Sequence, residues 1–156
     1  MYDEKFMRRA IELSATALDI PGARPYGAVV VKDGKIVGEG VNQVVPTGDP
    51  TAHAEVVAIR AACEAVGLHV LDGAVLYTSC EPCPMCLSAA WWARVKEIVY
   101  ANNRADAAAI GFDDDAIYEE VAAPLHQRKL PIRRFGADEA LEVFKLWHAK
   151  PDKVPY

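Results

Sequence analysis

The sequence predicts a three-layer α/β/α sandwich around a mixed five-stranded sheet, and three observations predict it. Asp33-Gly34 separates two short runs rich in Val and Ile, which is typical of an antiparallel hairpin. A strand, a helix and a strand follow one another within residues 74–101, which indicates a right-handed parallel crossover. Helical patterns flank these strands, so both faces of the sheet can be covered. The length of 156 residues suits one domain.

The chain is expected to begin with a helix over residues 3–18. Its apolar residues recur every three or four positions, which places them on one helical face. Pro21-Gly22 ends this helix, and the strands of the hairpin follow at 27–32 and 36–41. The apolar face consists of Phe6, Ala10, Leu13 and Ala17.

A loop over residues 42–50 leads to a second helix, for which Thr51 can act as the N-cap. Residues 74–78 and 97–101 are expected to form strands, and the helix between them covers residues 83–93. Proline at the entry of that helix agrees with the preference for proline in a first helical turn. The buried side of the second helix is expected to carry Ala54, Val57, Ala58, Ala61 and Val66.

In the last third of the chain, helices are expected over 115–122 and 138–147, with a fifth strand at 130–135. Residues 148–156 contain two prolines and are expected to form an extended C-terminal arm. Other residues are assigned to packing without a chemical role, since free cysteine and tryptophan are commonly buried. These are Cys63, Cys80, Trp91 and Trp92.

The composition argues against nucleic acid and membranes as binding partners. A formal net charge of −5 weighs against a nucleic-acid backbone, because proteins that bind one usually gather Lys and Arg on one face. No apolar run approaches the 18 residues of a membrane-spanning helix, and the first residues do not resemble a signal peptide. We therefore expect a cytoplasmic protein whose four cysteines serve as ligands or core residues and not as disulfides.

Two short segments contain the residues of a metal site. His53 and Glu55 lie in the first, and Cys83 and Cys86 lie in the second, where Pro82 precedes them. His-x-Glu combined with Pro-Cys-x-x-Cys is the signature of zinc nucleobase deaminases. Zinc favours thiolate and imidazole ligands in a tetrahedron, and cysteines three residues apart at a helix start can turn both sulfurs toward one point. We expect His53, Cys83 and Cys86 to bind one zinc ion and to leave its fourth position for water.

Glu55 is the expected acid and base. Two thiolates formally cancel the charge of Zn²⁺, so this ion should acidify its water less than a zinc ion held by three histidines. Glu55 follows His53 by two residues and can reach that water without being a ligand. It would take the proton of the water, pass it to a ring nitrogen and later protonate the departing amine.

Each segment alone has other interpretations. A Cys-x-x-Cys pair after a strand also occurs in thioredoxin-like redox proteins. A structural zinc module normally closes with a fourth protein ligand, and none is seen nearby in the sequence. A redox pair leaves His53 and Glu55 unexplained, so a zinc-dependent hydrolytic deaminase is the favoured hypothesis.

Several longer stretches carry a resemblance to known proteins. They are Pro25-Tyr26-Gly27-Ala28-Val29-Val30, residues 49–55, residues 76–86, residues 107–118 with Gly111-Phe112-Asp113-Asp114, and the terminal Tyr156. Over nearly its whole length the chain resembles the cytidine-deaminase superfamily, and more narrowly the short bacterial guanine deaminases. The zinc motif is common to the superfamily, whereas the Gly-Phe-Asp-Asp loop and the terminal tyrosine are more selective.

The resemblance implies a cytidine deaminase-like fold and the conversion of guanine to xanthine with release of ammonia. It also implies a homodimer in which the C-terminal segments are exchanged, so that residues 148–156 close the active site of the partner. Asn42 matches a residue that contacts the base, Asp114 matches an acidic residue that reads it, and Tyr26 stands where the family usually has Phe. The substrate-binding positions implied are Tyr26, Asn42, Ala54, Asp114 and Tyr156.

Other substrates stay open at this point. The tRNA adenosine deaminases share the same zinc motif, although an acidic chain with a closing arm is poorly suited to a polynucleotide. Aminotriazines, pterins and cytosine are related small substrates. A redox or structural zinc module is the alternative that is not an enzyme.

Overall fold

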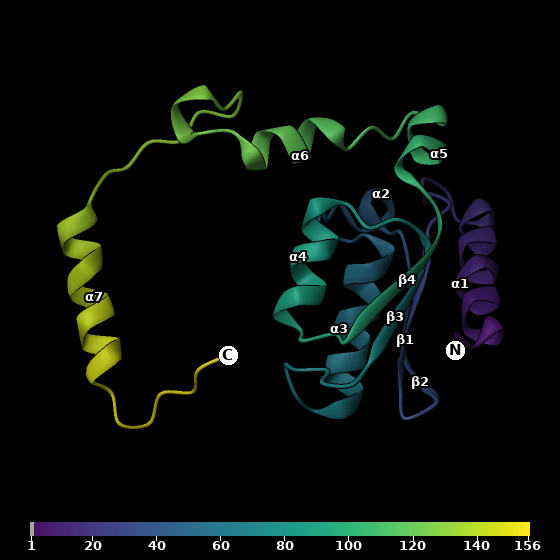
Figure 1. Cartoon of the computed structure of the whole chain (residues 1–156), viewed down its shortest axis with the longest axis horizontal. Helices are drawn as coiled ribbons and strands as arrows, with labels where there is room; N and C mark the ends of the chain where they lie inside the picture. The colour runs from purple at the N-terminus through teal and green to yellow at the C-terminus, as the bar shows by residue number, and fades with distance from the viewer. Residues whose placement is uncertain (1) are drawn as a thin grey trace. The chain divides into compact units, whose positions relative to one another are not determined.

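The computed structural model describes residues 2–156, and its centre is a four-stranded sheet in the order β2-β1-β3-β4 (Figure 1). Strand β1 (Gly27–Lys32) pairs antiparallel with both β2 (Lys35–Val41) and β3 (Val75–Cys80). Strand β3 pairs parallel with β4 (Glu97–Asn102). The predicted mixed sheet with its hairpin and its parallel crossover is confirmed.

The hairpin turn has the backbone that its sequence demands. Asp33 and Gly34 both have positive φ angles, of 51° and 73°. A two-residue type I′ turn needs positive φ at both central positions, and Asp-Gly is among the pairs that tolerate it. The local sequence therefore determines where β1 and β2 reverse direction.

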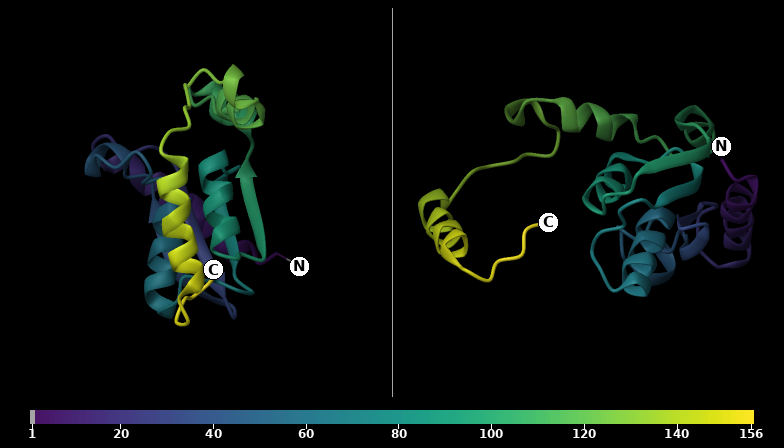
Figure 2. Two further views of the ribbon diagram at one scale, coloured as in Figure 1. Left: turned by 90° about the vertical axis from the view of Figure 1, so that its left-hand side faces the viewer. Right: turned by 60° about the horizontal axis from the view of Figure 1, so that its bottom comes forward.

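Helices cover both faces of the sheet (Figures 1 and 2). On one face lies α1 (Glu4–Thr16), continued by the short helix η1 (Ala17–Asp19), and on the other lie α3 (Ala54–Val66) and α4 (Pro84–Trp92). The three predicted layers are confirmed. The apolar face of α1 packs on the sheet as expected, through Phe6, Ala10 and Leu13.

Helix α3 lies unusually close to the sheet at two glycines of β2. A Cβ atom added at Gly40 would lie 2.3 Å from the carbonyl oxygen of Ala54, and one added at Gly38 would lie 2.3 Å from that of Ala58. Only glycine permits backbone to approach backbone so closely. These two glycines therefore determine how far α3 stands from the sheet.

The buried side of α3 differs from the predicted one. Its buried residues are Ala54, Glu55, Val56, Ala58, Ile59 and Ala62, whereas Val57, Ala61 and Val66 are only partly buried. The helix also begins after His53 and not after Thr51. The hydroxyl of Thr51 donates to Asp49 at 2.6 Å, so it does not cap the helix.

Two short helices were not predicted. Helix α2 (Val44–Thr47) lies within the expected loop, and α5 (Arg104–Ala109) follows β4. The start of α5 carries a reciprocal capping box between Asn103 and Asp106. Asparagine is a favoured N-cap residue, so Asn103 was the helix start signal that the sequence offered.

The predicted fifth strand is wrong. Residues 130–135 form no strand in the part of the chain that the structure describes, and Phe135 is fully exposed. A strand exists only where a neighbour accepts and donates its hydrogen bonds, and Pro131 has no N–H to donate. Trp91 and Trp92 also differ from expectation, because both are exposed on α4.

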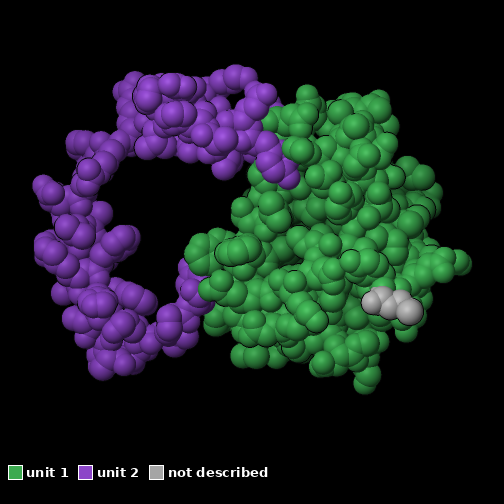
Figure 3. Space-filling view, in the orientation of Figure 1, with its two compact units in different colours: residues 1–115 green, residues 116–156 purple. Residues whose placement is uncertain are grey.

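The residues after Asp115 form a second compact unit, 116–156 (Figure 3). Helices α6 (Asp115–Ala122) and α7 (Ala137–Ala149) confirm the two predicted C-terminal helices, and a single turn, η2 (Leu125–Gln127), lies between them. Helix α7 includes His148 and Ala149, so the extended C-terminal part begins at Lys150. From residue 2 to residue 156, no helix has the length and apolarity to cross a bilayer.

Candidate active site

The candidate metal ligands lie where two helices begin at the same end of the sheet. His53 is the N-cap of α3, Cys83 is the N-cap of α4, and Cys86 lies in the first turn of α4. Strands β2 and β3 both run antiparallel to β1, so the helices that follow them start at the same sheet edge. Both helix N-termini carry positive partial charge, which favours thiolates there.

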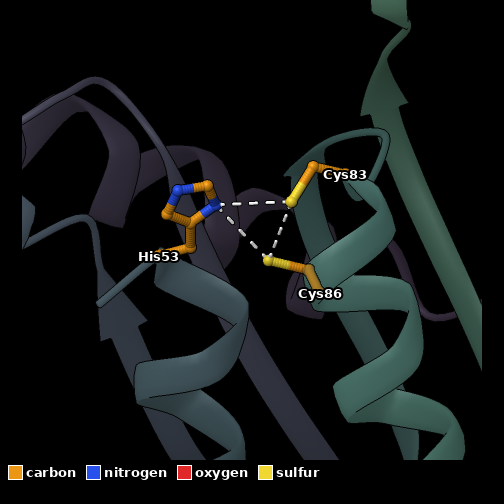
Figure 4. A group of neighbouring side chains, drawn as sticks. All are labelled: His53, Cys83 and Cys86. Carbon is orange, nitrogen blue, oxygen red and sulfur yellow. Dashed lines mark hydrogen bonds between the residues drawn. The ribbon is translucent and has the colours of Figure 1, made fainter. Parts of the chain in front are cut away.

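The three side chains form a compact triangle (Figure 4). Nδ1 of His53 lies 3.5 Å from Sγ of Cys83 and 3.5 Å from Sγ of Cys86, and the two sulfurs are 3.6 Å apart. A tetrahedral zinc ion with its usual bond lengths requires nitrogen–sulfur separations of about 3.6 Å and a sulfur–sulfur separation of about 3.8 Å. The triangle therefore already has the size that zinc requires, and the chemistry of the donors fits the same ion.

The protonation of the two thiols differs. Hydrogen bonds with Cys86, above all, and with His53 lower the pKa of Cys83 to about 4, although burial opposes this shift. The pKa of Cys86 is raised, first by the hydrogen bond that it shares with Cys83 and then by burial. Cys83 is thus the first thiolate of the pair, and a cation is needed for both sulfurs to ionise together.

Glu55 lies beside this triangle in the first turn of α3. Its side chain is buried, and its Oε2 accepts a hydrogen bond from Cys86 at 3.4 Å. Burial raises the pKa of this carboxyl above its ordinary value. A carboxyl group whose pKa is raised toward neutral pH can both take and give protons, as an acid–base catalyst must.

Tyr26 and Asn42 border the same end of the sheet. Tyr26 immediately precedes β1 and Asn42 immediately follows β2, and the N–H of Asn42 donates to the carbonyl of Tyr26 at 3.1 Å. Asn42 is buried, and its Oδ1 accepts from the N–H of Val44 at 3.3 Å. That leaves the NH₂ of Asn42 as the group free to donate.

Asp114 lies in the loop after α5 and is half-buried. Burial raises the pKa of its carboxyl, while the charge of Arg104 opposes that rise. Arg104 forms ion pairs with Glu81 at 3.4 Å and with Asp115 at 3.1 Å. It thereby connects the loop of Asp114 to the segment just before Cys83.

Sequence reasoning assigned no role to Arg104 or to Phe112. The ring of Phe112 packs edge-on against Tyr26, with centroids 5.3 Å apart and planes at 87°. Phe112 lies in the Gly-Phe-Asp-Asp stretch that carries part of the resemblance, and this was the signal available for it. No sequence pattern pointed to Arg104, because its two partners are distant along the chain.

The two remaining predicted residues are placed differently. The side chain of Ala54 is fully buried in the apolar core, so only its backbone could meet a substrate. Tyr156 belongs to the second unit, in which it is exposed. The first unit thus brings together His53, Cys83 and Cys86 with Glu55, and its strand ends bring Tyr26 to Asn42.

The segment that carries His53 is itself anchored. The carboxylate of Asp49 accepts from the N–H of Thr51 at 2.8 Å and from a guanidinium N–H of Arg60 at 3.2 Å. The hydrogen bonds from Thr51 lower the pKa of Asp49, so it is ionised at neutral pH. Because Arg60 belongs to α3, these bonds connect the approach to His53 with the helix it caps.

Comparison with known proteins gives matches that include the segments of this candidate site. A family model, the cytidine and deoxycytidylate deaminase zinc-binding region, matches residues 1–102, which include the three candidate ligands and Glu55. The chain is 47% identical to a guanine deaminase of Bacillus subtilis over 156 residues, which is 100% of both chains. An X-ray structure of guanine deaminase from Bacillus subtilis has a TM-score of 0.95 and covers 100% of this chain and 99% of that one. A tRNA-specific adenosine deaminase of Haemophilus influenzae is 40% identical over 119 residues, 72% of this chain and 68% of that protein.

Proposed function

The chain belongs to the family of cytidine and deoxycytidylate deaminases, and we propose that it hydrolyses guanine to xanthine and ammonia. The observation that supports hydrolytic deamination is the triangle of His53, Cys83 and Cys86 with the buried Glu55 beside it. Similarity over the full length to a guanine deaminase supports guanine as the base, because it extends beyond the zinc-binding region into the loop of Asp114 and the C-terminus.

We assign the ligation of one zinc ion to His53, Cys83 and Cys86. When bound there, zinc supplies a Lewis acid that activates water. Glu55 takes one proton from the water and delivers it to a ring nitrogen of the base. It then takes the second proton, from the hydroxyl group now on the attacked carbon, and delivers it to the amine, which leaves as ammonia while the carbonyl forms. Its burial keeps bulk water away from these transfers, and its raised pKa suits a group that must accept and release a proton in one cycle.

Base selection is assigned to Asn42, Asp114 and Tyr156, with the ring of Tyr26 as a packing surface. An ionised carboxylate accepts hydrogen bonds and cannot donate them, so Asp114 suits an N–H of guanine. Asn42 can donate through its NH₂. A base that left these groups unpaired would lose about 1–3 kcal/mol for each, or roughly 5- to 150-fold.

We further propose that residues 1–156 act as one deaminase domain in a homodimer, with residues 148–156 closing the site of the partner. No residue of the second unit is buried among those described, although α7 carries Leu141, Phe144 and Trp147. Monomers rarely expose so many large apolar side chains, which supports a second copy as their cover.

Complementation tests the exchange of arms. A Glu55→Gln chain retains its arm, and a chain lacking residues 151–156 retains Glu55. The Glu55→Gln homodimer should lose its activity and the truncated homodimer should be sharply impaired. A mixture refolded together should recover activity, because one site of the heterodimer has both Glu55 and the arm of the partner chain. Absence of recovery in a proven heterodimer would exclude the exchange.

Ammonia release from a panel of amino-heterocycles tests the substrate. Guanine should be deaminated and adenine should not, and Glu55→Gln should retain zinc and fold while losing at least roughly 10⁴-fold in rate, the upper end of what one positioned acid–base contributes. Wild-type turnover in Glu55→Gln would refute the proton transfers.

A second candidate, a tRNA adenosine deaminase, is supported by the similarity to such enzymes over 72% of the chain. The net charge of −5 argues against it, because tRNA binding depends on phosphate contacts. Deamination of adenosine in tRNA without activity on guanine would make it the correct function. Zinc content without turnover of any base would instead favour a structural module.

A further inference from the structure

The hydroxyl oxygen of Tyr26 is buried and has no hydrogen-bond partner among residues 2–156. A buried hydroxyl without a partner is costly, because it has given up its bonds to water and received none in return. Such groups are uncommon in folded proteins, and one at a functional site calls for an explanation. The ring of Tyr26 packs well, since it lies against the apolar core and edge-on to Phe112.

Tyr26 lies beside Asn42, at the end of the sheet where the helices capped by His53 and Cys83 begin. Burial, together with the smaller effect of the charges of Cys80, Glu55 and Asp114, raises the pKa of Tyr26 to about 12. The hydroxyl therefore stays protonated at any physiological pH and remains a donor. It lies within the electrostatic reach of the proposed proton carrier and of the residue proposed to read the base.

The site residues offer few side-chain donors. Glu55 and Asp114 are carboxyl groups, and the Oδ1 of Asn42 is already occupied by the N–H of Val44. Among Tyr26, Asn42, Glu55 and Asp114, the donors that stay protonated are therefore the NH₂ of Asn42 and the hydroxyl of Tyr26. A guanine ring carries acceptors at O6, N3 and N7, which carboxylates cannot satisfy.

We propose that the hydroxyl of Tyr26 is a specificity-determining donor that binds a carbonyl or ring-nitrogen acceptor of the bound base. This inference rests on the proposed function and adds to it a contact that a phenylalanine could not make. A base that accepts this hydrogen bond satisfies the buried hydroxyl, whereas a base without an acceptor there leaves it unpaired.

The substitution Tyr26→Phe tests the proposal, because it removes the hydroxyl and retains the ring against Phe112. The zinc-loaded variant should bind guanine roughly 5- to 150-fold more weakly than wild type, equivalent to about 1–3 kcal/mol for an unmade buried hydrogen bond. Its melting temperature without ligand should equal or exceed that of wild type, since the unpaired hydroxyl is gone. Binding is measured by inhibition constants and by the ligand-induced rise in Tm, which requires no turnover.

Analogues of guanine that each lack one acceptor identify the contact. 3-Deazaguanine lacks N3, 7-deazaguanine lacks N7, and 6-thioguanine carries a poor acceptor at position 6. Tyr26→Phe should weaken two of them as much as guanine, and should not weaken the one that lacks the partner of the hydroxyl. Equal weakening of all three, as a structural role or a bridging water would produce, overturns the proposal, and so does no weakening at all.

Tyr77→Phe is the matched control. The hydroxyl of Tyr77 accepts a hydrogen bond from the N–H of Asp3 at 3.4 Å on the opposite face of the sheet. This variant should leave ligand binding unchanged.

The proposed function and the role of Tyr26 are tested separately. Failure of the wild type to release ammonia from guanine would refute the proposed function, whereas the binding comparison between wild type and Tyr26→Phe would still decide the role of the hydroxyl.

Discussion

Replacing Gly40 with alanine should damage the metal site without altering any of its residues. A Cβ atom there would lie 2.3 Å from the carbonyl oxygen of Ala54 and 2.6 Å from the nitrogen of Ala58. Both are backbone atoms of α3, so no side chain can rotate away and the helix itself must move. Restoring an ordinary contact of about 3.4 Å requires the first turn of α3 to retreat by about 1 Å.

That turn carries Glu55 and follows His53. A catalytic site tolerates displacements of about 0.5 Å, and an error of about 1 Å can cost roughly 10²-fold in rate. Gly40→Ala should therefore lower kcat/KM on guanine by roughly 100-fold and weaken zinc binding. Overpacking of this kind should also lower the free energy of unfolding by about 1–3 kcal/mol.

Gly38→Ala is the matched comparison, because its Cβ would press on α3 at Ala58 and Ala62, one turn further from the metal. Both variants should lose similar stability in urea titrations, and Gly40→Ala should show the larger loss of zinc in competition with a chromogenic chelator. If the two variants lost zinc affinity and activity equally, the effect would be a general loss of stability and the reasoning would be refuted.

Other perturbations have equally definite outcomes. Cys83→Ala should remove both zinc and activity, since only two ligands remain, and full zinc occupancy by metal analysis would contradict the ligand assignment. Deleting residues 151–156 should sharply reduce guanine deamination and leave zinc bound, whereas full activity would exclude a closing arm. Glu39→Gln should lower the free energy of unfolding at pH 7 by about 0.2–1 kcal/mol, because Glu39 pairs with Arg9 at 2.8 Å with both side chains more than a third exposed. The hydrogen bond from Arg9 lowers the pKa of Glu39 below its ordinary value of 4.5. The stability that this pair contributes to the fold is therefore present above pH 4.5 and disappears as the pH falls through the lower pKa of the folded state. If Glu39→Gln lowered the free energy of unfolding equally at pH 7 and well below pH 4.5, this explanation would be wrong.

Local chemistry accounts for what the sequence predicted well. The hairpin at Asp33-Gly34 depends on two backbone angles that the residues themselves favour. The sulfurs of Cys83 and Cys86 lie close together because the two cysteines are three positions apart at a helix start. The apolar stripe of α1 depends only on helical periodicity, and the structure buries Phe6, Ala10 and Leu13 as expected.

Contacts that depend on a distant partner were predicted less well. Residues 130–135 have strand-like composition but no strand to pair with in the part of the chain that the structure describes. Thr51 does not cap the helix because its hydroxyl donates a hydrogen bond to Asp49 in the preceding loop, so His53 is the N-cap instead. Trp91 and Trp92 were assigned to the core on hydrophobicity, yet their side of α4 is exposed.

Residue type and short spacing in the sequence were enough to predict the candidate metal ligands, the candidate acid–base residue, the strands β1 to β4 and the helices α1, α3 and α4. The close approach of α3 to Gly40, and the ion pairs by which Arg104 connects the loop of Asp114 to the segment before Cys83, depend instead on tertiary packing. The same holds for the ring contact of Tyr26 with Phe112 and for the burial of the Tyr26 hydroxyl without a hydrogen-bond partner among the described residues. These features join residues that are tens of positions apart, and their distances depend on how whole helices pack on the sheet, which no local pattern encodes.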